Sequence, residues 1–139
     1  MAIKFSVIQR GQPGVVGGGE KKYYASSQST GELTLAGLTK RIEKISTVSG
    51  ADIRAVVYAM VDVMKDSLSE GQIVRLGELG SLRVSIGSDG KDTEKEVTSA
   101  AISSARVIFT PGKDIKDMLL TLTYEKVAST STPEPPAIS

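Results

Sequence analysis

The chain has 139 residues, 40% of them hydrophobic and 24% charged, which suits a domain with its own core and argues against a wholly disordered or fibrous protein. It contains no His, Cys or Trp, which excludes the usual general base, a thiolate nucleophile, imidazole or thiolate metal sites and disulfides. Its 17 Lys and Arg against 16 Asp and Glu give a formal net charge of +1, so the total charge does not point to a nucleic-acid or membrane partner.

The first ten residues predict a β-strand. Ile3, Phe5 and Val7 recur at every second position, the period of a half-buried strand. This is not the apolar block of a signal peptide, and no later stretch approaches the roughly 20 apolar residues of a membrane helix. We therefore expect a soluble, cytoplasmic protein. Glycines from Gly11 to Gly19 break the strand, and residues 21–26 predict a second short one.

Two helical patterns follow. From Leu35 to Ile45 apolar residues recur at spacings of three and four, which predicts an amphipathic helix. Residues 49–52 (SGAD) have the form of a capping box and predict the start of a second helix, which runs to about Leu68. Its apolar stripe is wider than a short neighbouring helix covers. A second copy of the chain, in a two-fold dimer, is the simplest partner for that stripe.

Residues 73–86 predict a β-hairpin with a tight glycine turn, after Glu70-Gly71 ends the helix. Residues 87–98 are polar and predict a loop or an exposed hairpin tip. Residues 99–110 regain strand character, and Pro111-Gly112 then suits the first turn of a short helix.

The end of the chain predicts one more strand and a tail. Residues 120–127 alternate in strand fashion and are expected to pair with the first strand, which would join both chain ends in one small sheet. Residues 128–139 are rich in Ser, Thr and Pro and are expected to be disordered.

Three stretches, in this order, resemble the bacterial histone-like family of HU and integration host factor. Residues 38–74 look like the two dimer-forming helices of that family without a gap. Residues 74–84 (VRLGELGSLRV) are similar to its V-x-L-x-G-F-G-T-F-x-V turn. Residues 105–119 (ARVIFTPGKDIKDML) are similar to its R-V-x-F-x-P-G-K-x-L-K ending. The strands at both chain ends look like an N-terminally extended subgroup, in which a terminal sheet decorates the HU core.

The resemblance implies an α+β fold of the HU and integration host factor type: a two-helix dimerisation body, a β-hairpin saddle with an arm, a short C-terminal helix and an added terminal β-sheet. Residues 1–33 are expected to form an N-terminal strand and Gly-rich extension packing on the core. Residues 34–119 would be the DNA-binding domain, 120–127 the terminal strand and 128–139 the disordered tail.

The resemblance also implies double-stranded DNA as the partner, bound through cations and backbone N–H groups beside its phosphates. Pro111-Gly112-Lys113 offers both, although proline at a helix start and glycine in a turn are also ordinary structural choices. Three strand arginines would line the saddle over the minor groove, unless they form only a solvated strand face. The residues expected to bind DNA are Arg75, Gly80, Ser81, Arg83, Arg106, Gly112, Lys113 and Lys116. The expected dimer core is Val56, Val57, Met60, Val61, Met64, Leu79 and Leu82.

Two departures from the family pattern concern the strength of DNA binding and the extent of DNA bending. Glu78 replaces the first glycine of the family's G-F-G turn, so its carboxylate must point away from DNA or weaken the contact. The arm between Val84 and Val107 has a net charge of −1 and lacks the family's R-N-P tip, whose proline wedges between base pairs. We therefore expect weaker DNA bending than in a typical HU protein.

The basic excess lies in residues 1–30, which hold four basic residues and one acidic residue. Of these, Lys4, Lys21 and Lys22 are candidates for extra phosphate contacts. Solubility of a glycine-rich loop explains the same charges equally well.

The predicted function is low-specificity binding of double-stranded DNA by a histone-like homodimer with a nucleoid or architectural role, such as DNA condensation. The alternative is an interaction or scaffold protein that keeps the fold, contacts protein partners through its acidic arm and binds DNA weakly or not at all. No paired-carboxylate or nucleophile-elbow spacing supports an enzyme. No cofactor, metal, membrane or small-molecule substrate is expected.

Overall fold

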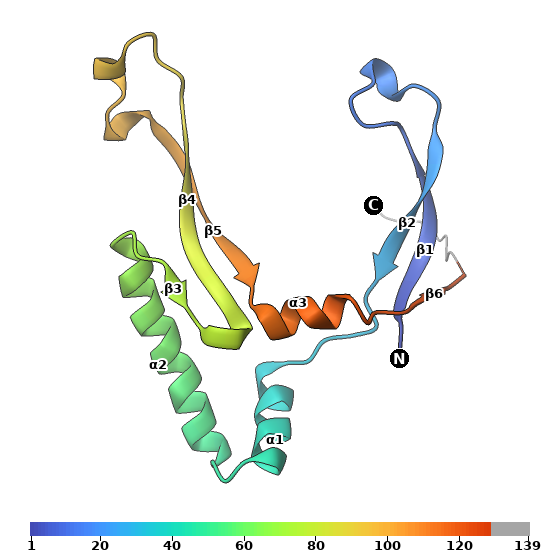
Figure 1. Ribbon diagram of the computed structural model, residues 1–139, viewed down its shortest axis with the longest axis vertical. Helices are drawn as coiled ribbons and strands as arrows, with labels where there is room; N and C mark the ends of the chain where they lie inside the picture. The colour runs from blue at the N-terminus through green and yellow to red at the C-terminus, as the bar shows by residue number, and fades with distance from the viewer. Residues whose placement is uncertain (129–139) are drawn as a thin grey trace, which may run out of the picture. The chain divides into compact units, whose positions relative to one another are not determined.

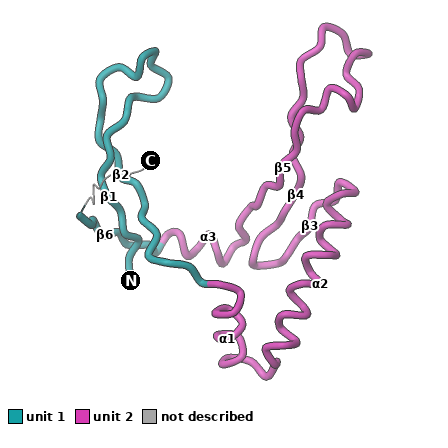
Figure 2. The backbone as a smooth tube through the Cα atoms, turned by 180° about the vertical axis from the view of Figure 1, so that it is seen from behind, with its two compact units in different colours: residues 1–33, 121–139 teal, residues 34–120 magenta. Residues whose placement is uncertain are grey.

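The computed structural model describes residues 1–128, which form two compact units (Figure 2). The terminal unit comprises residues 1–33 and the described residues from Thr121 onward, and the central unit comprises residues 34–120. Within the described residues, three α-helices and two three-stranded sheets make a mixed α+β fold, as predicted (Figure 1). The predicted tail lies outside the described residues except for Ala128, and the packing of residues 1–33 on the core stays a prediction.

The terminal unit is a sheet in the order β2-β1-β6. β1 (Ile3–Arg10) pairs antiparallel with β2 (Lys22–Gln28) and parallel with β6 (Tyr124–Lys126). The predicted pairing of the first and last strands is confirmed. β6 is shorter than predicted, because Leu120 still donates its N–H to the Asp117 carbonyl (3.1 Å) at the end of a helix.

The central unit begins with α1 (Leu35–Ile45) and α2 (Gly50–Ser69), which are in contact with each other. Thr34 caps α1 by accepting the Gly37 N–H, and Ser49 caps α2 by accepting the Asp52 N–H. α2 ends at Ser69, and Gly71, just beyond the C-cap Glu70, has a φ of +84°, which favours glycine. Both helices lie where the hydrophobic periodicity predicts them.

The second sheet has the order β3-β4-β5. β3 (Val74–Arg75) leads through a 3-10 turn (Gly77–Leu79) into β4 (Gly80–Ser88), and β5 (Ile102–Pro111) returns beside it. Between β4 and β5, residues 89–101 form the arm tip, with two further 3-10 turns at Glu94–Glu96 and Ser99–Ala101. The predicted hairpin and arm are therefore present, and β5 starts later than expected because of the second turn.

The final helix, α3 (Lys113–Leu119), starts two residues later than predicted. Pro111 still pairs with Gly80 in the sheet, and the Gly112 N–H donates to the Leu79 carbonyl (3.0 Å). Pro111 is therefore the last residue of β5, and Gly112 is the N-cap of the helix rather than part of its first turn.

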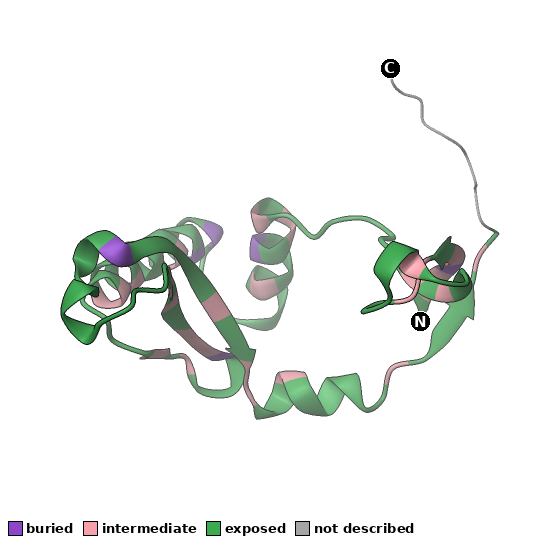
Figure 3. Ribbon diagram, turned by 90° about the horizontal axis from the view of Figure 1, so that it is seen from above, coloured by how far each residue is buried: buried purple, intermediate pink, exposed green. Residues whose placement is uncertain are grey.

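Few apolar side chains are buried in the described chain (Figure 3). Ile53 and Ala101 are the only described hydrophobic residues that are buried, and five large hydrophobic residues of α2 are exposed: Val56, Tyr58, Met60, Val61 and Val63. One copy of the central unit therefore leaves the predicted apolar stripe of α2 largely uncovered.

Candidate nucleic-acid interface

The strand register sorts the side chains of the central sheet onto two faces. Residues directly opposite in an antiparallel pair share a face, and successive residues alternate. The register pairs Arg75 with Ser81, Ser81 with Thr110, and Ser85 with Arg106. One face, here called the arginine face, therefore carries Arg75, Ser81, Arg83, Ser85, Arg106 and Thr110, together with Ile108 opposite Arg83. None of the three strands contains an acidic residue.

The other face of this sheet is apolar. It carries Val74 and Leu82, which pair with each other, followed by Val84 opposite Val107. Val74 also lines a cavity with Met60 of α2, which places α2 on this side of the sheet. The arginines therefore project away from α2, as the strand pattern predicts.

Four predicted site residues meet in one open hollow of about 270 Å³ at the end of the arginine face. The hollow includes three residues whose side chains donate hydrogen bonds, Arg75, Ser81 and Thr110, and a backbone wall of glycine and proline. Its full lining is Arg75, Gly77, Gly80, Ser81, Thr110, Pro111 and Gly112. Arg83 and Arg106 lie further along the same face, as diagonal neighbours, because Arg83 pairs with Ile108 and Arg106 with Ser85.

Two glycines allow the backbone to close around this hollow. A Cβ on Gly80 would lie 2.4 Å from the Thr110 carbonyl oxygen, and Gly80 has a φ of +140°. A Cβ on Gly112 would lie 2.3 Å from the Glu78 carbonyl oxygen. The prediction that Pro111-Gly112-Lys113 offers backbone N–H groups to phosphate is wrong for Gly112, because its N–H is already bonded to the Leu79 carbonyl. Gly80 and Gly112 therefore shape the hollow, and Gly112 has no free amide to offer.

The two lysines of α3 differ in their surroundings. Lys113 Nζ forms an ion pair with Asp117 Oδ2 (2.7 Å), in which both side chains are exposed. Such a surface pair contributes about 0–1 kcal/mol, so a phosphate can compete with Asp117 for the ammonium group. Lys116 is exposed, and no ion pair forms at its side chain within residues 1–128.

The predicted cations of the terminal unit also differ. Lys4 forms an ion pair with Glu125 of the neighbouring strand, which partly satisfies its charge. Lys21 and Lys22 are exposed at the start of β2. Arg10 places its guanidinium carbon 5.6 Å from the ring centre of Tyr24.

The residues predicted for a dimer core are partly open in the single chain. Val57, Met64 and Leu82 are half-buried. Val56, Met60, Val61 and Leu79 are exposed.

Within the described chain, no cluster of acidic side chains is placed to hold a metal ion. Over the same residues, no helix combines the length and the apolar character that a membrane crossing requires.

A paired-helix body, a three-stranded sheet extended by a long hairpin arm, and a short helix after the last strand define a protein with an HU-like domain. The chain belongs to the HU-HIG family, described as an HU domain fused to wHTH, Ig, or Glycine-rich motif, whose family model matches residues 1–126. A comparison with curated proteins gave no match.

Among solved structures, the chain is similar to a "Putative bacterial DNA binding protein" from Bacteroides vulgatus ATCC 8482, with a TM-score of 0.64 and 15% sequence identity. The similarity covers 91% of this chain and 48% of the other, so this chain spans about half the length of that protein. At this identity the likeness concerns the fold alone.

Sequence reasoning missed Thr110 and Ser85 on the arginine face. The signal for Thr110 was its place opposite Ser81, which is visible only once the register of two distant strands is known. Arg10 was recognised as part of the basic excess, but its position opposite Lys22 also depends on the register.

Proposed function

We propose that this protein binds double-stranded DNA with low sequence specificity through the arginine face, as a non-enzymatic, histone-like homodimer with an architectural role in the nucleoid. One observation carries the proposal: three arginines share one face of an acid-free sheet, on the side away from α2. The HU domain of the family and the DNA-binding description of the Bacteroides vulgatus protein support it.

The chemistry of this face suits phosphates better than bases. Guanidinium groups and hydroxyls donate hydrogen bonds to phosphate oxygens, and such contacts carry no direct sequence information. The central unit holds twelve basic and twelve acidic residues, so its overall charge gives no attraction to DNA. Binding therefore depends on the local arrangement of Arg75, Arg83 and Arg106. The hollow beside Arg75 would bind one phosphate group.

The homodimer part of the proposal rests on the exposed apolar surface. α2 exposes Val56, Met60 and Val61, and the sheet exposes Val107 and Phe109 on its apolar face. A second copy that covers α2 and this face would give the central unit the core that a single copy lacks.

DNA bending by this dimer is proposed to be weak. The arm tip, residues 89–101, contains four acidic residues and two lysines and no proline. It therefore lacks both the net positive charge that would hold a wrapped duplex and the proline wedge that would open a base step.

The acidic arm tip also supports the second candidate function, a scaffold in which the arm contacts basic protein partners and DNA binding is weak. Its charged residues, Asp89, Lys91, Asp92, Glu94, Lys95 and Glu96, are all exposed. The acidic residues outnumber the lysines, so the net negative charge of the arm tip would repel it from the phosphate backbone and favour a cationic partner.

A salt titration separates the two functions. Binding to a random-sequence duplex is measured by fluorescence anisotropy at several salt concentrations, for the wild type and for Arg83→Gln/Arg106→Gln. Each lost phosphate contact should reduce the slope of log affinity against log salt by about 0.9, so the double variant should reduce it by one to two.

The matched control is Arg54→Gln/Lys65→Gln, which removes the same charge from α2. This control should leave the slope close to that of the wild type. Equal slopes for the two double variants would contradict the role of the arginine face. A wild-type affinity no better than about 10⁻⁴ M at physiological salt would favour the scaffold.

A further inference from the structure

The sheet of the terminal unit has one polar face whose charges are distributed unevenly. The register pairs Lys4 with Glu125 and Gln28, Ile8 with Tyr24, and Arg10 with Lys22. The polar face therefore consists of Lys4, Ser6, Ile8, Arg10, Lys22, Tyr24, Ser26, Gln28 and Glu125.

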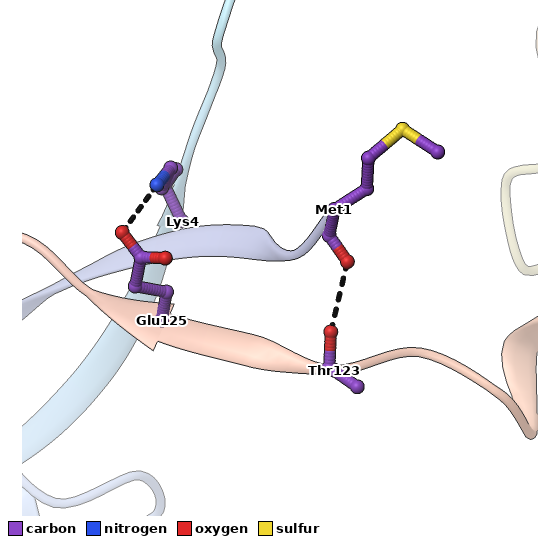
Figure 4. Close-up of polar contacts among 4 residues, drawn as sticks. All are labelled: Met1, Lys4, Thr123 and Glu125. Carbon is purple, nitrogen blue, oxygen red and sulfur yellow. Dashed lines mark hydrogen bonds and ion pairs between the residues drawn. The ribbon is translucent and has the colours of Figure 1, made fainter.

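At one end of this face the polar groups satisfy one another. Lys4 pairs with Glu125 (Figure 4), and Gln28 Nε2 donates to Ser6 Oγ (2.8 Å). On the parallel strand pair beside them, Thr123 Oγ1 donates to the Met1 carbonyl (2.9 Å). This end has little unsatisfied charge to offer a ligand.

At the other end two cations face each other. Arg10 and Lys22 are directly opposite across the β1–β2 pair, and Lys21 precedes Lys22. Like charges in this position destabilise a sheet. Neither Arg10 nor Lys22 forms an ion pair with any residue in the described part of the chain. An anion between them would relieve the repulsion.

Two contacts hold this pair of cations in place. The Arg10 guanidinium lies over the Tyr24 ring, an arrangement that orients its N–H groups. Beyond the strands, the Gln12 N–H donates to the Gly18 carbonyl (2.7 Å), and Gly11 lies so close to Gly18 that a Cβ would sit 2.9 Å from the Gly18 Cα. This closed loop keeps the ends of β1 and β2 in register.

We propose that the cationic hairpin end, formed by Arg10, Lys21, Lys22 and Tyr24, is a second binding site for the phosphate backbone of double-stranded DNA, separate from the arginine face. The proposal takes DNA as the ligand from the proposed function. It differs from the phosphate contacts predicted from the sequence, Lys4, Lys21 and Lys22, in excluding Lys4, which pairs with Glu125, and in adding Arg10 from the same basic excess.

Duplex DNA is favoured over other anionic surfaces because the hairpin is tethered to an HU domain. Once the arginine face holds a duplex, the hairpin meets phosphates at a high effective concentration. Val15 and Val16 are exposed in the adjoining loop, so an anionic membrane surface is the competing ligand.

The test compares Arg10→Gln/Lys22→Gln with a matched control, Lys4→Gln/Lys126→Gln, in the full chain. Lys126 pairs with Phe5 and therefore lies on the opposite face of the same sheet. Salt titrations on a long random-sequence duplex should show a slope smaller by one to two for the first variant, at about 0.9 per lost contact, and an unchanged slope for the control. Circular dichroism checks that both variants keep the fold.

The outcomes separate this site from the proposed function. A reduced slope for Arg10→Gln/Lys22→Gln, but not for the control, supports the site whether or not Arg83→Gln/Arg106→Gln has an effect. A wild-type slope in Arg10→Gln/Lys22→Gln, beside a reduced slope in Arg83→Gln/Arg106→Gln, overturns the site and leaves the proposed function standing. Absence of DNA binding by the wild type overturns both.

Binding to vesicles of phosphatidylglycerol tests the competing ligand, an anionic membrane surface. Binding to these vesicles that is lost in Arg10→Gln/Lys22→Gln, while the DNA slope stays unchanged, would assign the cations to a membrane surface and overturn the proposal.

Discussion

Gly112 occupies a position where any side chain would collide with backbone. Its φ of −78° suits every residue, so the constraint comes from space alone: a Cβ would lie 2.3 Å from the Glu78 carbonyl oxygen and 2.6 Å from its carbon. The 3-10 turn and the start of α3 meet at this point, and both border the hollow of the arginine face.

We expect Gly112→Ala to lower the free energy of unfolding by about 1–3 kcal/mol, the usual range for an overpacked site. The matched control is Gly90→Ala in the arm tip, where no atom lies within 4 Å of the new Cβ, and it should change stability little. Urea denaturation at one protein concentration measures both variants. Equal denaturation midpoints for the two variants would show that the backbone around Gly112 accommodates the added methyl group without a loss of stability.

The lysines show how far single residues could be predicted from the sequence. Lys4 and Lys113 were both assigned to phosphates, and both form ion pairs in the structure. Asp117 lies four residues after Lys113 in a helix, a spacing that the sequence displays. Glu125 lies 121 residues after Lys4, and only the pairing of β1 with β6 brings the two together.

At the scale of elements, the start of α2 also shows that sequence spacing predicts contacts within one stretch of the chain but not contacts between elements. The sequence predicted a capping box, and Ser49 Oγ does accept the Asp52 N–H (3.2 Å). The buried Gly50 N–H is bonded instead by Glu43 Oε2 (2.6 Å), which comes from α1. Local spacing therefore predicted the helix start, whereas this second bond depends on how α1 and α2 pack.

The arm is the element on which DNA bending depends. We expect the wild type to bend DNA by well under the roughly 20–90° of proteins that insert apolar wedges. Asp92→Asn/Glu94→Gln should tighten binding, because it removes two like charges from the arm tip, and should still bend DNA weakly because no wedge is gained. Circular-permutation gel shifts measure the bend, with Asp62→Asn/Asp66→Asn on α2 as the charge-matched control.

A sharp bend by the wild type would contradict this expectation. Val97 is the large hydrophobic residue of the arm tip that is exposed, and loss of such a bend in Val97→Ala would identify it as the wedge. An affinity gain equal to that of the α2 control would mean that the arm lies away from the duplex.

At the scale of the whole molecule, the sequence predicted the order of helices and strands, because periodicity and turn residues are local signals. It also predicted that the first and last strands pair, but not their register. It did not place Thr110 in the hollow or Arg10 opposite Lys22. Those positions follow from strand register, and a shift of one residue would move each side chain to the other face.

The exposed apolar surface of the central unit leads to the last prediction. Ile53 is the one buried apolar residue of α1 and α2, so a single copy has little core to stabilise its fold. If two copies supply each other's core, folding and association are coupled. The denaturation midpoint of the wild type should then rise with protein concentration, by about 1.4 kcal/mol of stability per dimer for each tenfold increase.

Val56→Asp tests the location of that surface. Val56 is 56% exposed in the single chain and lines two apolar hollows along α2, so a charge there should block association without disturbing an existing intrachain core. Ala55→Asp places the same charge about 100° around the helix from Val56, on the side that carries Asp62 and Asp66, and should remain dimeric. Sedimentation equilibrium measures the mass of each. A monomeric wild type whose midpoint does not depend on concentration would contradict the dimer, even if Val56→Asp failed to fold.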